Sequence, residues 1–163
     1  MKVTLYASIS LNGMIARKNG DEDFLSDDIW NSFSVLVNSF QNLIIGRKTY
    51  EVVKKWDENY SFDDFKNVIK VVISSDQNYK LDGGYVLALN PREALELLKE
   101  KGFSKILIAG GAGLNSSFAK EDLIDEIILN VEPVIIGDGI SLFSNTDFDF
   151  RLKCIDVKNL PNG

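Results

Sequence analysis

The sequence of 163 residues lacks histidine and has a single cysteine, Cys154. Without an imidazole there is no histidine base for catalysis. Without a second thiol, an intramolecular disulfide and a zinc site of the Cys/His type are both excluded. We therefore expect no metal cofactor. The scarcity of cysteine also fits a reducing compartment, and we expect the protein in the cytoplasm.

Long apolar runs and an excess of positive charge are missing as well. No segment approaches the ~20 apolar residues of a membrane-spanning helix, and the N-terminus has no basic stretch followed by an apolar one. The 18 lysines and arginines are outnumbered by 24 acidic residues, which gives a net charge of -6. The composition therefore predicts neither a membrane partner nor a nucleic-acid partner, and a small anionic ligand would need a local binding site.

The sequence does contain enough apolar residues, 45%, to predict one domain over residues 1–163. Apolar runs alternate with helical patterns, which predicts an α/β fold of three layers. Its central sheet is mainly parallel and antiparallel at the C-terminal edge, with helices on both faces. The expected strands are 3–9, 43–46, 68–73, 85–89, 105–109, 126–131 and 134–136. The expected helices follow Ser26, begin near Thr49, and cover 92–101 and 114–119.

A glycine turn, Gly46-Arg47-Lys48-Thr49, follows the apolar strand that ends at Ile45. Glycine lets the backbone turn tightly, and Thr49 is placed to cap the helix that follows. Arg47 and Lys48 add positive charge at the N-terminal end of that helix. This pattern predicts a phosphate-binding site. The alternative is an ordinary strand-to-helix turn with a capping threonine and two solvated cations.

A second glycine turn, Gly110-Gly111-Ala112-Gly113, follows another apolar strand. In the dinucleotide fingerprint G-x-G-x-x-G, Ser116 would fill the third glycine position, and few residues remain for a dinucleotide-binding half. A Rossmann topology is therefore not expected. The small residues still let a pyrophosphate approach the backbone closely. The alternative is a tight turn packed against its neighbour.

Two polar pairs complete the candidate residues. Ser74 and Ser75 end the strand 68–73, where their hydroxyls would reach a 2′-phosphate beside Arg47, or would simply cap a turn. Asp27 and Asp28 stand at the start of a predicted helix. Its dipole favours carboxylates there without any further role, and this explanation suffices for at least one of them.

Six segments carry a pattern that spans nearly the whole chain: 7–16, 46–51, 72–75, 110–111, 122–126 and 133–139. Together they resemble the dihydrofolate-reductase-like superfamily. The resemblance is strongest to the branch that includes the reductase domain of riboflavin biosynthesis. It implies the dihydrofolate-reductase-like α/β fold, with NADPH bound across the carboxyl edge of the sheet.

The resemblance implies a cofactor site built from both glycine turns and the serine pair. Its residues are Ser8 and Ile15 beside the nicotinamide, Gly46, Arg47, Lys48 and Thr49 on the phosphates, Ser74 and Ser75 near the 2′-phosphate, and Ala109, Gly110, Gly111, Ala112, Gly113 and Leu114 along the pyrophosphate. Tyr6 and Asn130 would face the substrate. Asp28 matches the acid that binds a pteridine ring in relatives, and we expect it half-buried and able to donate a proton.

The activity that the resemblance implies is NADPH-dependent reduction of a small molecule by a cytoplasmic homodimer. The substrate would be a ribosylaminopyrimidine, as for a 5-amino-6-(5-phosphoribosylamino)uracil reductase of riboflavin biosynthesis, or a related pteridine. Dihydrofolate reductase activity proper is one alternative. A non-catalytic nucleotide-binding module of the same fold is another. Relatives also continue with one more strand beyond the position of Pro161-Asn162-Gly163.

Overall fold

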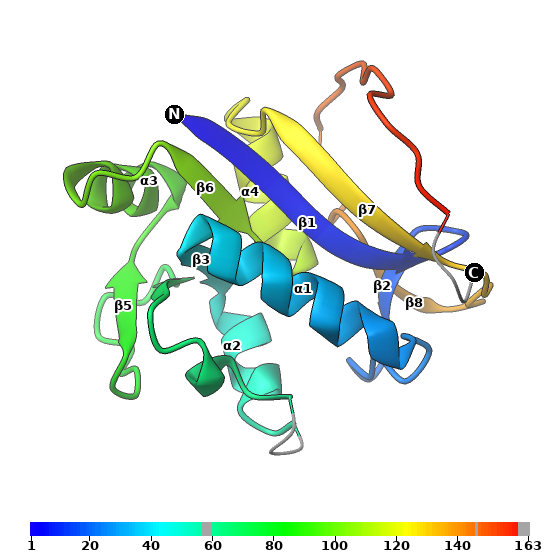
Figure 1. The fold of residues 1–163 in the computed structure, drawn as a ribbon, viewed down its shortest axis with the longest axis horizontal. Helices are drawn as coiled ribbons and strands as arrows, with labels where there is room; N and C mark the ends of the chain where they lie inside the picture. Colours follow the sequence, from blue (N-terminus) through cyan, green and yellow to red (C-terminus); the bar gives the residue numbers. More distant parts are fainter. Residues whose placement is uncertain (57–59, 146, 160–163) are drawn as a thin grey trace.

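A six-stranded parallel sheet is the centre of the computed structural model, which describes residues 1–56, 60–145 and 147–159 (Figure 1). The strands lie in the spatial order β5-β4-β3-β6-β1-β7. In chain order they are β1 (Lys2–Ser10), β3 (Asn42–Gly46), β4 (Ile69–Ile73), β5 (Tyr85–Ala88), β6 (Lys105–Ile108) and β7 (Glu126–Glu132). Every neighbouring pair is parallel, so all the carboxyl ends lie at one edge of the sheet.

Helices cover both faces of this sheet. On one face lie α1 (Asp27–Phe40), α2 (Arg47–Val53) and the 3-10 helix η2 (Phe62–Asp64). On the other lie α3 (Pro91–Glu100) and α4 (Ala112–Lys120). The three layers predicted from the sequence are therefore confirmed. In the part of the chain that the structure describes, no helix is long and apolar enough to cross a membrane.

The apolar strands are continuous because they are buried on both faces. In β3, Leu43 and Ile45 pack against α1 and α2, whereas Ile44 between them packs against α3 and α4. This alternation follows from the period of two in a strand. All three side chains are at most 1% exposed. Burying each one contributes about 1.5–3 kcal/mol.

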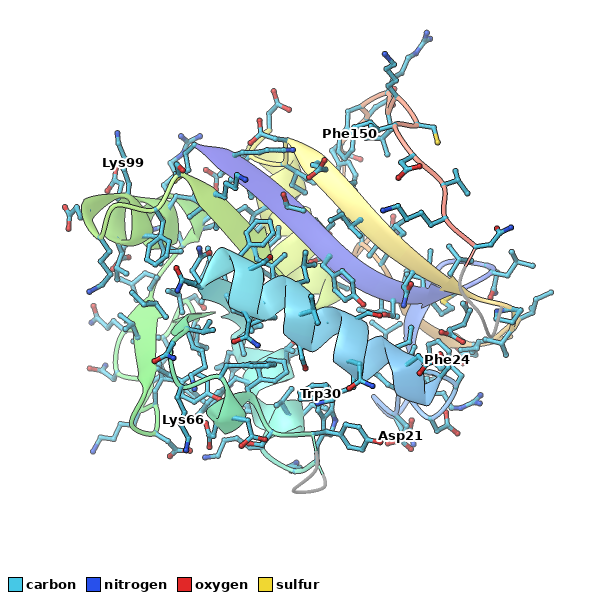
Figure 2. The ribbon with its side chains drawn as sticks, in the orientation of Figure 1. Asp21, Phe24, Trp30, Lys66, Lys99 and Phe150 are labelled. Carbon is cyan, nitrogen blue, oxygen red and sulfur yellow. The ribbon has the colours of Figure 1, made fainter. Side chains whose placement is uncertain are left out.

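Aromatic side chains hold α1 in place. Trp30 points from α1 toward the segment that follows α2 (Figure 2). Its ring stacks on those of Phe62 and Phe65, with centroid distances of 6.0 and 5.8 Å. Phe33, one turn further along α1, contacts the ring of Tyr6 in β1 at 5.4 Å. Aromatic pairs contribute about 0.5–1.5 kcal/mol each beyond the area they bury, so these contacts fix α1 over β1.

The capping residues predicted for α3 are confirmed, and the helix begins and ends one residue earlier than the predicted range 92–101. Asn90 caps the helix through its side chain, which accepts a hydrogen bond from the backbone N–H of Glu93 at 3.0 Å. Pro91 occupies the first helical position, where a missing N–H costs nothing. Gly102 follows the helix with φ +88°, a conformation that glycine adopts without strain. Local sequence signals were therefore sufficient to predict the capping residues of this helix.

A buried asparagine joins the two strands at the middle of the sheet. The side chain of Asn42 donates to the carbonyl of Lys105 at 2.9 Å and accepts from the N–H of Leu107 at 3.1 Å. Because the recorded register between β3 and β6 is the single pair Ile44 and Ile108, these side-chain bonds extend a short ladder. They fix the relative positions of β3 and β6, and with them the two turns at the opposite ends of these strands.

The antiparallel pairing predicted at the C-terminal edge lies in a separate sheet. At the edge of the central sheet, β7 is parallel to β1. The antiparallel pair is formed instead by β2 (Met14–Arg17) and β8 (Gly139–Ser141). Glycine at position 139 permits this pairing, since a Cβ there would lie 2.6 Å from the carbonyl oxygen of Ala16.

The strand predicted over 134–136 is absent from the structure. The backbone groups of this segment are held by loop contacts instead. The Asn12 side chain donates to the carbonyl of Ile136 at 2.7 Å and accepts from its N–H at 3.1 Å. The carbonyl of Val134 accepts from the N–H of Leu11 at 2.8 Å. These bonds tie the segment to the turn after β1, and so the apolar pattern alone predicted the wrong element.

The final segment lies beyond β7. Phe150 is at the top right of Figure 2, and its ring stacks on that of Phe148 with a centroid distance of 5.4 Å. The described residues of this segment, 147–159, have no regular secondary structure. Pro161-Asn162-Gly163, the position beyond which relatives were said to continue with one more strand, lies outside the described residues.

One carboxyl is strongly affected by the fold. Glu22 lies in the loop between β2 and α1, and burial raises the pKa of its carboxyl from 4.5 to about 7. Between these two pH values the folded chain keeps a proton on Glu22 that the unfolded chain has already lost. The stabilisation is therefore complete below about pH 4.5 and decreases as the pH rises through 7.

We expect Glu22→Gln to remove this pH dependence, because the amide stays neutral. Relative to the native chain, the free energy of unfolding of the variant should increase by as much as about 3 kcal/mol between pH 4 and 8. Urea denaturation at a series of pH values measures the difference. Glu96→Gln, at an exposed position of α3, is the matched control. A difference for Glu22→Gln that is constant with pH would contradict the burial of this carboxyl.

Candidate functional site

The two glycine turns meet at the carboxyl edge of the sheet. The N–H of Gly46 donates to the carbonyl of Gly110 at 2.8 Å. Just before the turns, the N–H of Ala109 donates to the carbonyl of Ile44 at 3.0 Å. A Cβ on Gly111 would lie 3.2 Å from the Oγ1 of Thr49. The turns therefore form one surface, here called the glycine cradle and defined as residues 46–49 and 110–114.

The backbone of the second turn is open to a ligand. Gly110 has φ +77°, and the peptide bond between Gly110 and Gly111 is cis. A Cβ built on Gly110 or on Gly113 would meet no atom within 4 Å. The helix α4 begins at Ala112, and the first N–H groups of a helix have no acceptor within it. A pyrophosphate therefore fits here, both by the space over the glycines and by the available donors.

Two apolar side chains lie at this surface: Leu114, which belongs to the glycine cradle, and Ile15, which lies next to it. The Cδ1 of Ile15, in β2, lies 4.0 Å from the position of a Cβ on Gly111. The Cβ of Leu114, in α4, lies 3.5 Å from the position of a Cβ on Gly46. Both residues were implied as cofactor contacts from the sequence. The structure brings them to the same small surface as the two turns, from different elements.

The role predicted for Thr49 as a helix cap is wrong. The residue at the N-cap position of α2 is Gly46, and no side chain caps this helix. The helix begins earlier than expected because Gly46 is extended and the helical conformation starts directly at Arg47. Thr49 is thus inside α2, and its hydroxyl faces Gly111 across the cradle. The hydroxyl lies next to the backbone of the second turn.

The cation of Arg47 has neighbours that the sequence analysis did not identify. Its Nη1 lies 3.1 Å from the Oε1 of Glu51, one helical turn away. Its guanidinium lies over the ring of Tyr79, 5.5 Å from the centroid. Tyr79 also donates its hydroxyl to the same Glu51 oxygen at 3.0 Å. Arg47 and Lys48 are both exposed.

The spacing of Arg47 and Glu51 by four residues was a readable signal for their ion pair. The sequence contains no signal for the contact of Tyr79 with Arg47, because the loop that follows β4 brings the two residues together.

The two serines after β4 differ in their surroundings. Ser74 is buried, and its Oγ accepts a hydrogen bond from the N–H of Asp76 at 3.2 Å. This is the turn-capping alternative considered from the sequence. Ser75 is exposed. Because Ile73 pairs with Gly46 in the sheet, Ser75 and Arg47 follow the ends of two neighbouring strands, β4 and β3.

A second polar group lies on β1 and β7, and β1 is the neighbour of β6 in the sheet. Ser8 of β1 is paired in register with Asn130 of β7. The hydroxyl of Tyr6 is 3.4 Å from that of Ser8. Burial raises the pKa of Tyr6, and the nearby Glu132 carboxylate raises it further. The Asn130 Nδ2 is buried and has no hydrogen-bond partner among the described residues. We call Tyr6, Ser8 and Asn130 the polar patch.

An unpaired buried amide costs about 1–3 kcal/mol, which an acceptor from a ligand would offset. The sheet order β3-β6-β1-β7 places the cradle and the polar patch on adjoining strands. The residues implied for the cofactor and those implied for the substrate are therefore neighbours on one sheet.

Asp28 is less enclosed than predicted. It is the second residue of α1, and its side chain is exposed rather than half-buried. The side chain of Ser26, at the N-cap position, makes no capping bond. Its Oγ instead donates to the Oε1 of Glu132 in β7 at 3.2 Å. This bond brings the start of α1, and Asp28 with it, to the end of β7 beyond Asn130.

A cavity of about 370 Å³ lies away from these residues, between α2 and β5. Its lining includes Lys54, Asp82, Asp63 and Tyr85. These groups bind one another: Lys54 pairs with Asp82, and Tyr85 donates to Asp63 at 3.1 Å. The cavity therefore offers few uncommitted polar groups. The cradle and the polar patch, with an unpaired amide and open glycine backbone, are the better candidate site.

Comparison with known proteins finds relatives along the whole chain. The family model for the RibD C-terminal domain matches residues 1–163. YwjB of Bacillus subtilis (strain 168), a protein of uncharacterised function, is 35% identical over 160 residues, which cover 96% of this chain and 91% of YwjB.

Solved structures show the same fold. A protein from Shewanella sp. PV-4 assigned to riboflavin biosynthesis is 26% identical, with a TM-score of 0.73, over 91% of this chain and 86% of that one. A Thermotoga maritima diaminohydroxyphosphoribosylaminopyrimidine deaminase/5-amino-6-(5-phosphoribosylamino)uracil reductase matches with 20% identity and a TM-score of 0.68. The match covers 91% of this chain and 49% of that one. The resemblance stated from the sequence is confirmed.

The cradle depends on glycine at one position more than at another. We expect Gly110→Ala to lower the free energy of unfolding by about 1–2 kcal/mol, because alanine is strained at φ +77°. Gly113→Ala is the matched control. Gly113 lies in α4, its φ is not positive, and its Cβ would enter open space. This control should be neutral or stabilising by up to about 1 kcal/mol. Equal losses in urea denaturation would contradict the geometry of the turn.

Proposed function

The chain belongs to the RibD C-terminal domain family, and from that premise we propose that it is an NADPH-dependent reductase. The observation that carries the proposal is the contact of the two glycine turns, with Gly46 and Gly110 joined at 2.8 Å. This contact exposes backbone donors beside a guanidinium at the carboxyl edge of a parallel sheet, where such folds bind nucleotides.

The proposed cofactor uses each part of the cradle. The pyrophosphate lies against the open backbone of Gly110 and Gly113 and the first N–H groups of α4. Arg47 and the exposed hydroxyl of Ser75 bind the 2′-phosphate that distinguishes NADPH from NADH. The hydroxyl of Thr49 lies beside the second turn and donates a hydrogen bond to a phosphate oxygen. Ile15 provides an apolar wall for the nicotinamide.

The polar patch is the proposed binding surface for the substrate. Its buried Asn130 amide needs an acceptor, and a carbonyl of a pyrimidine ring supplies one. Tyr6, whose hydroxyl is protonated at neutral pH as in any tyrosine, donates a second hydrogen bond. We therefore propose a ribosylaminopyrimidine as the substrate. The activity stated for the Thermotoga maritima relative, 5-amino-6-(5-phosphoribosylamino)uracil reductase, supports this choice.

The reaction places modest demands on the protein. The bound cofactor supplies a hydride, and the chain needs to hold the donor and acceptor carbons close together with water excluded. No histidine is required for this, which agrees with the composition. The proton that completes the reduction comes from water or from Asp28. Asp28 is exposed at the start of α1, and this end of the helix is tied to β7 through Ser26 and Glu132.

The proposal predicts that the protein oxidises NADPH in the presence of 5-amino-6-(5-phosphoribosylamino)uracil. The loss of NADPH absorbance measures this oxidation. Dihydrofolate in a parallel assay distinguishes dihydrofolate reductase activity. Oxidation with dihydrofolate alone would move the substrate class to pteridines. Saturable binding of NADPH without oxidation by a panel of pyrimidines and pterins would contradict a reductase and favour a nucleotide-binding module.

If Asp28 rather than water is the proton donor, Asp28→Asn should lower kcat by an order of magnitude or more, because an amide is not an acid catalyst. The KM for NADPH should stay unchanged. Asp23→Asn, which alters an exposed carboxylate of the preceding loop, controls for the loss of a charge. Steady-state kinetics across pH measures the effect. Native turnover at every pH would exclude Asp28 as the proton donor.

A further inference from the structure

The ring of Tyr79 is the platform on which the Arg47 cation rests. The guanidinium carbon lies 5.5 Å from the ring centroid, within the range of a cation–π contact. The tyrosine hydroxyl donates to the same oxygen of Glu51 that pairs with Arg47, at 3.0 and 3.1 Å respectively. Three side chains thus form a closed group: cation on ring, ring hydroxyl on carboxylate, and carboxylate on cation.

The loop that carries Tyr79 also carries the serines. It leaves β4 at Ser74 and turns tightly, because Asp76 accepts from the N–H groups of Asn78 at 2.9 Å and of Tyr79 at 3.1 Å. The Asp76 N–H in turn donates to the Ser74 Oγ at 3.2 Å. The loop is therefore internally bonded. By docking Tyr79 on α2, it fixes the position of Ser75 relative to Arg47.

The closed group leaves the guanidinium able to bind an anion. The ion pair with Glu51 uses Nη1, and the ring of Tyr79 covers one face of the plane without using an N–H group. Arginine has five N–H donors in that plane, and a phosphate takes them in pairs. The carboxylate of Glu51 is a competing anion, and the hydroxyl of Tyr79 binds it.

We propose that Tyr79 is a positioning residue that sets the preference of this chain for NADPH over NADH. It holds the Arg47 guanidinium at the end of β3, next to the strand that Ser75 follows, where the 2′-phosphate of NADPH binds and where NADH has only a hydroxyl. The inference rests on the proposed function, since it refines how the cofactor is recognised. A side chain without a ring at position 79 would release both the cation and the loop.

The test is calorimetric titration of the whole protein with NADP⁺ and with NAD⁺, which needs no substrate and no turnover. The variants are Tyr79→Leu, Tyr79→Phe and Arg47→Ala. We expect Tyr79→Leu to raise the Kd for NADP⁺ about five- to tenfold and to leave the Kd for NAD⁺ within about twofold. Tyr79→Phe keeps the ring and should stay within about threefold of the native chain. Arg47→Ala should show the largest selective loss of NADP⁺.

The outcomes separate the inference from the proposed function. If the native chain binds NADP⁺ more tightly than NAD⁺ and Tyr79→Leu leaves both constants unchanged, or weakens both equally, the role of Tyr79 is wrong and the cofactor assignment stands. If Tyr79→Phe loses as much as Tyr79→Leu, the ring is not the platform. If the native chain binds neither nucleotide, the proposed function and the inference both fail.

Discussion

The hydrogen bond from the Gly46 N–H to the Gly110 carbonyl is the contact on which the candidate site depends. It joins the ends of β3 and β6, which are paired in register only at Ile44 and Ile108. At the opposite end of the same strands, Asn42 makes the side-chain bonds that extend this short ladder. The two strands are thus fixed at both ends. The closest approach is at Gly111, where a Cβ would lie 3.2 Å from the Oγ1 of Thr49, whereas Gly110 is required by its φ of +77°.

Around that contact, groups from distant parts of the chain meet because parallel strands end at the same edge. Arg47 comes from α2, Ile15 from β2, and Tyr79 from the loop after β4. The polar patch on β1 and β7 adds an amide without a partner in the described part of the chain. One region therefore offers hydrogen-bond donors for an anion, an apolar wall, and an amide N–H group without an acceptor. A dinucleotide and a small polar ring require this combination.

The sequence predicted what local signals and burial control. The order of the six central strands and the four α-helices, the three layers and the caps of α3 followed from apolar periodicity and from Asn90, Pro91 and Gly102, whereas β2 and β8 were not predicted. It did not predict features that depend on contacts between distant segments. The segment 134–136 forms hydrogen bonds with the Asn12 side chain rather than with a strand, and Thr49 lies inside a helix that begins at Arg47. Tyr79 reaches Arg47 through a loop whose path no local pattern indicates, and the exposure of Asp28 depends on how α1 docks.

The measurement that tests the account most directly is a crystal structure of the protein grown with NADP⁺. The account predicts the pyrophosphate within hydrogen-bond distance of the backbone N–H groups at 111–114. It also predicts the 2′-phosphate on the Arg47 guanidinium, with the nicotinamide pointing toward Ser8 and Asn130. Density for the nucleotide at another place, with both glycine turns facing solvent, would contradict it.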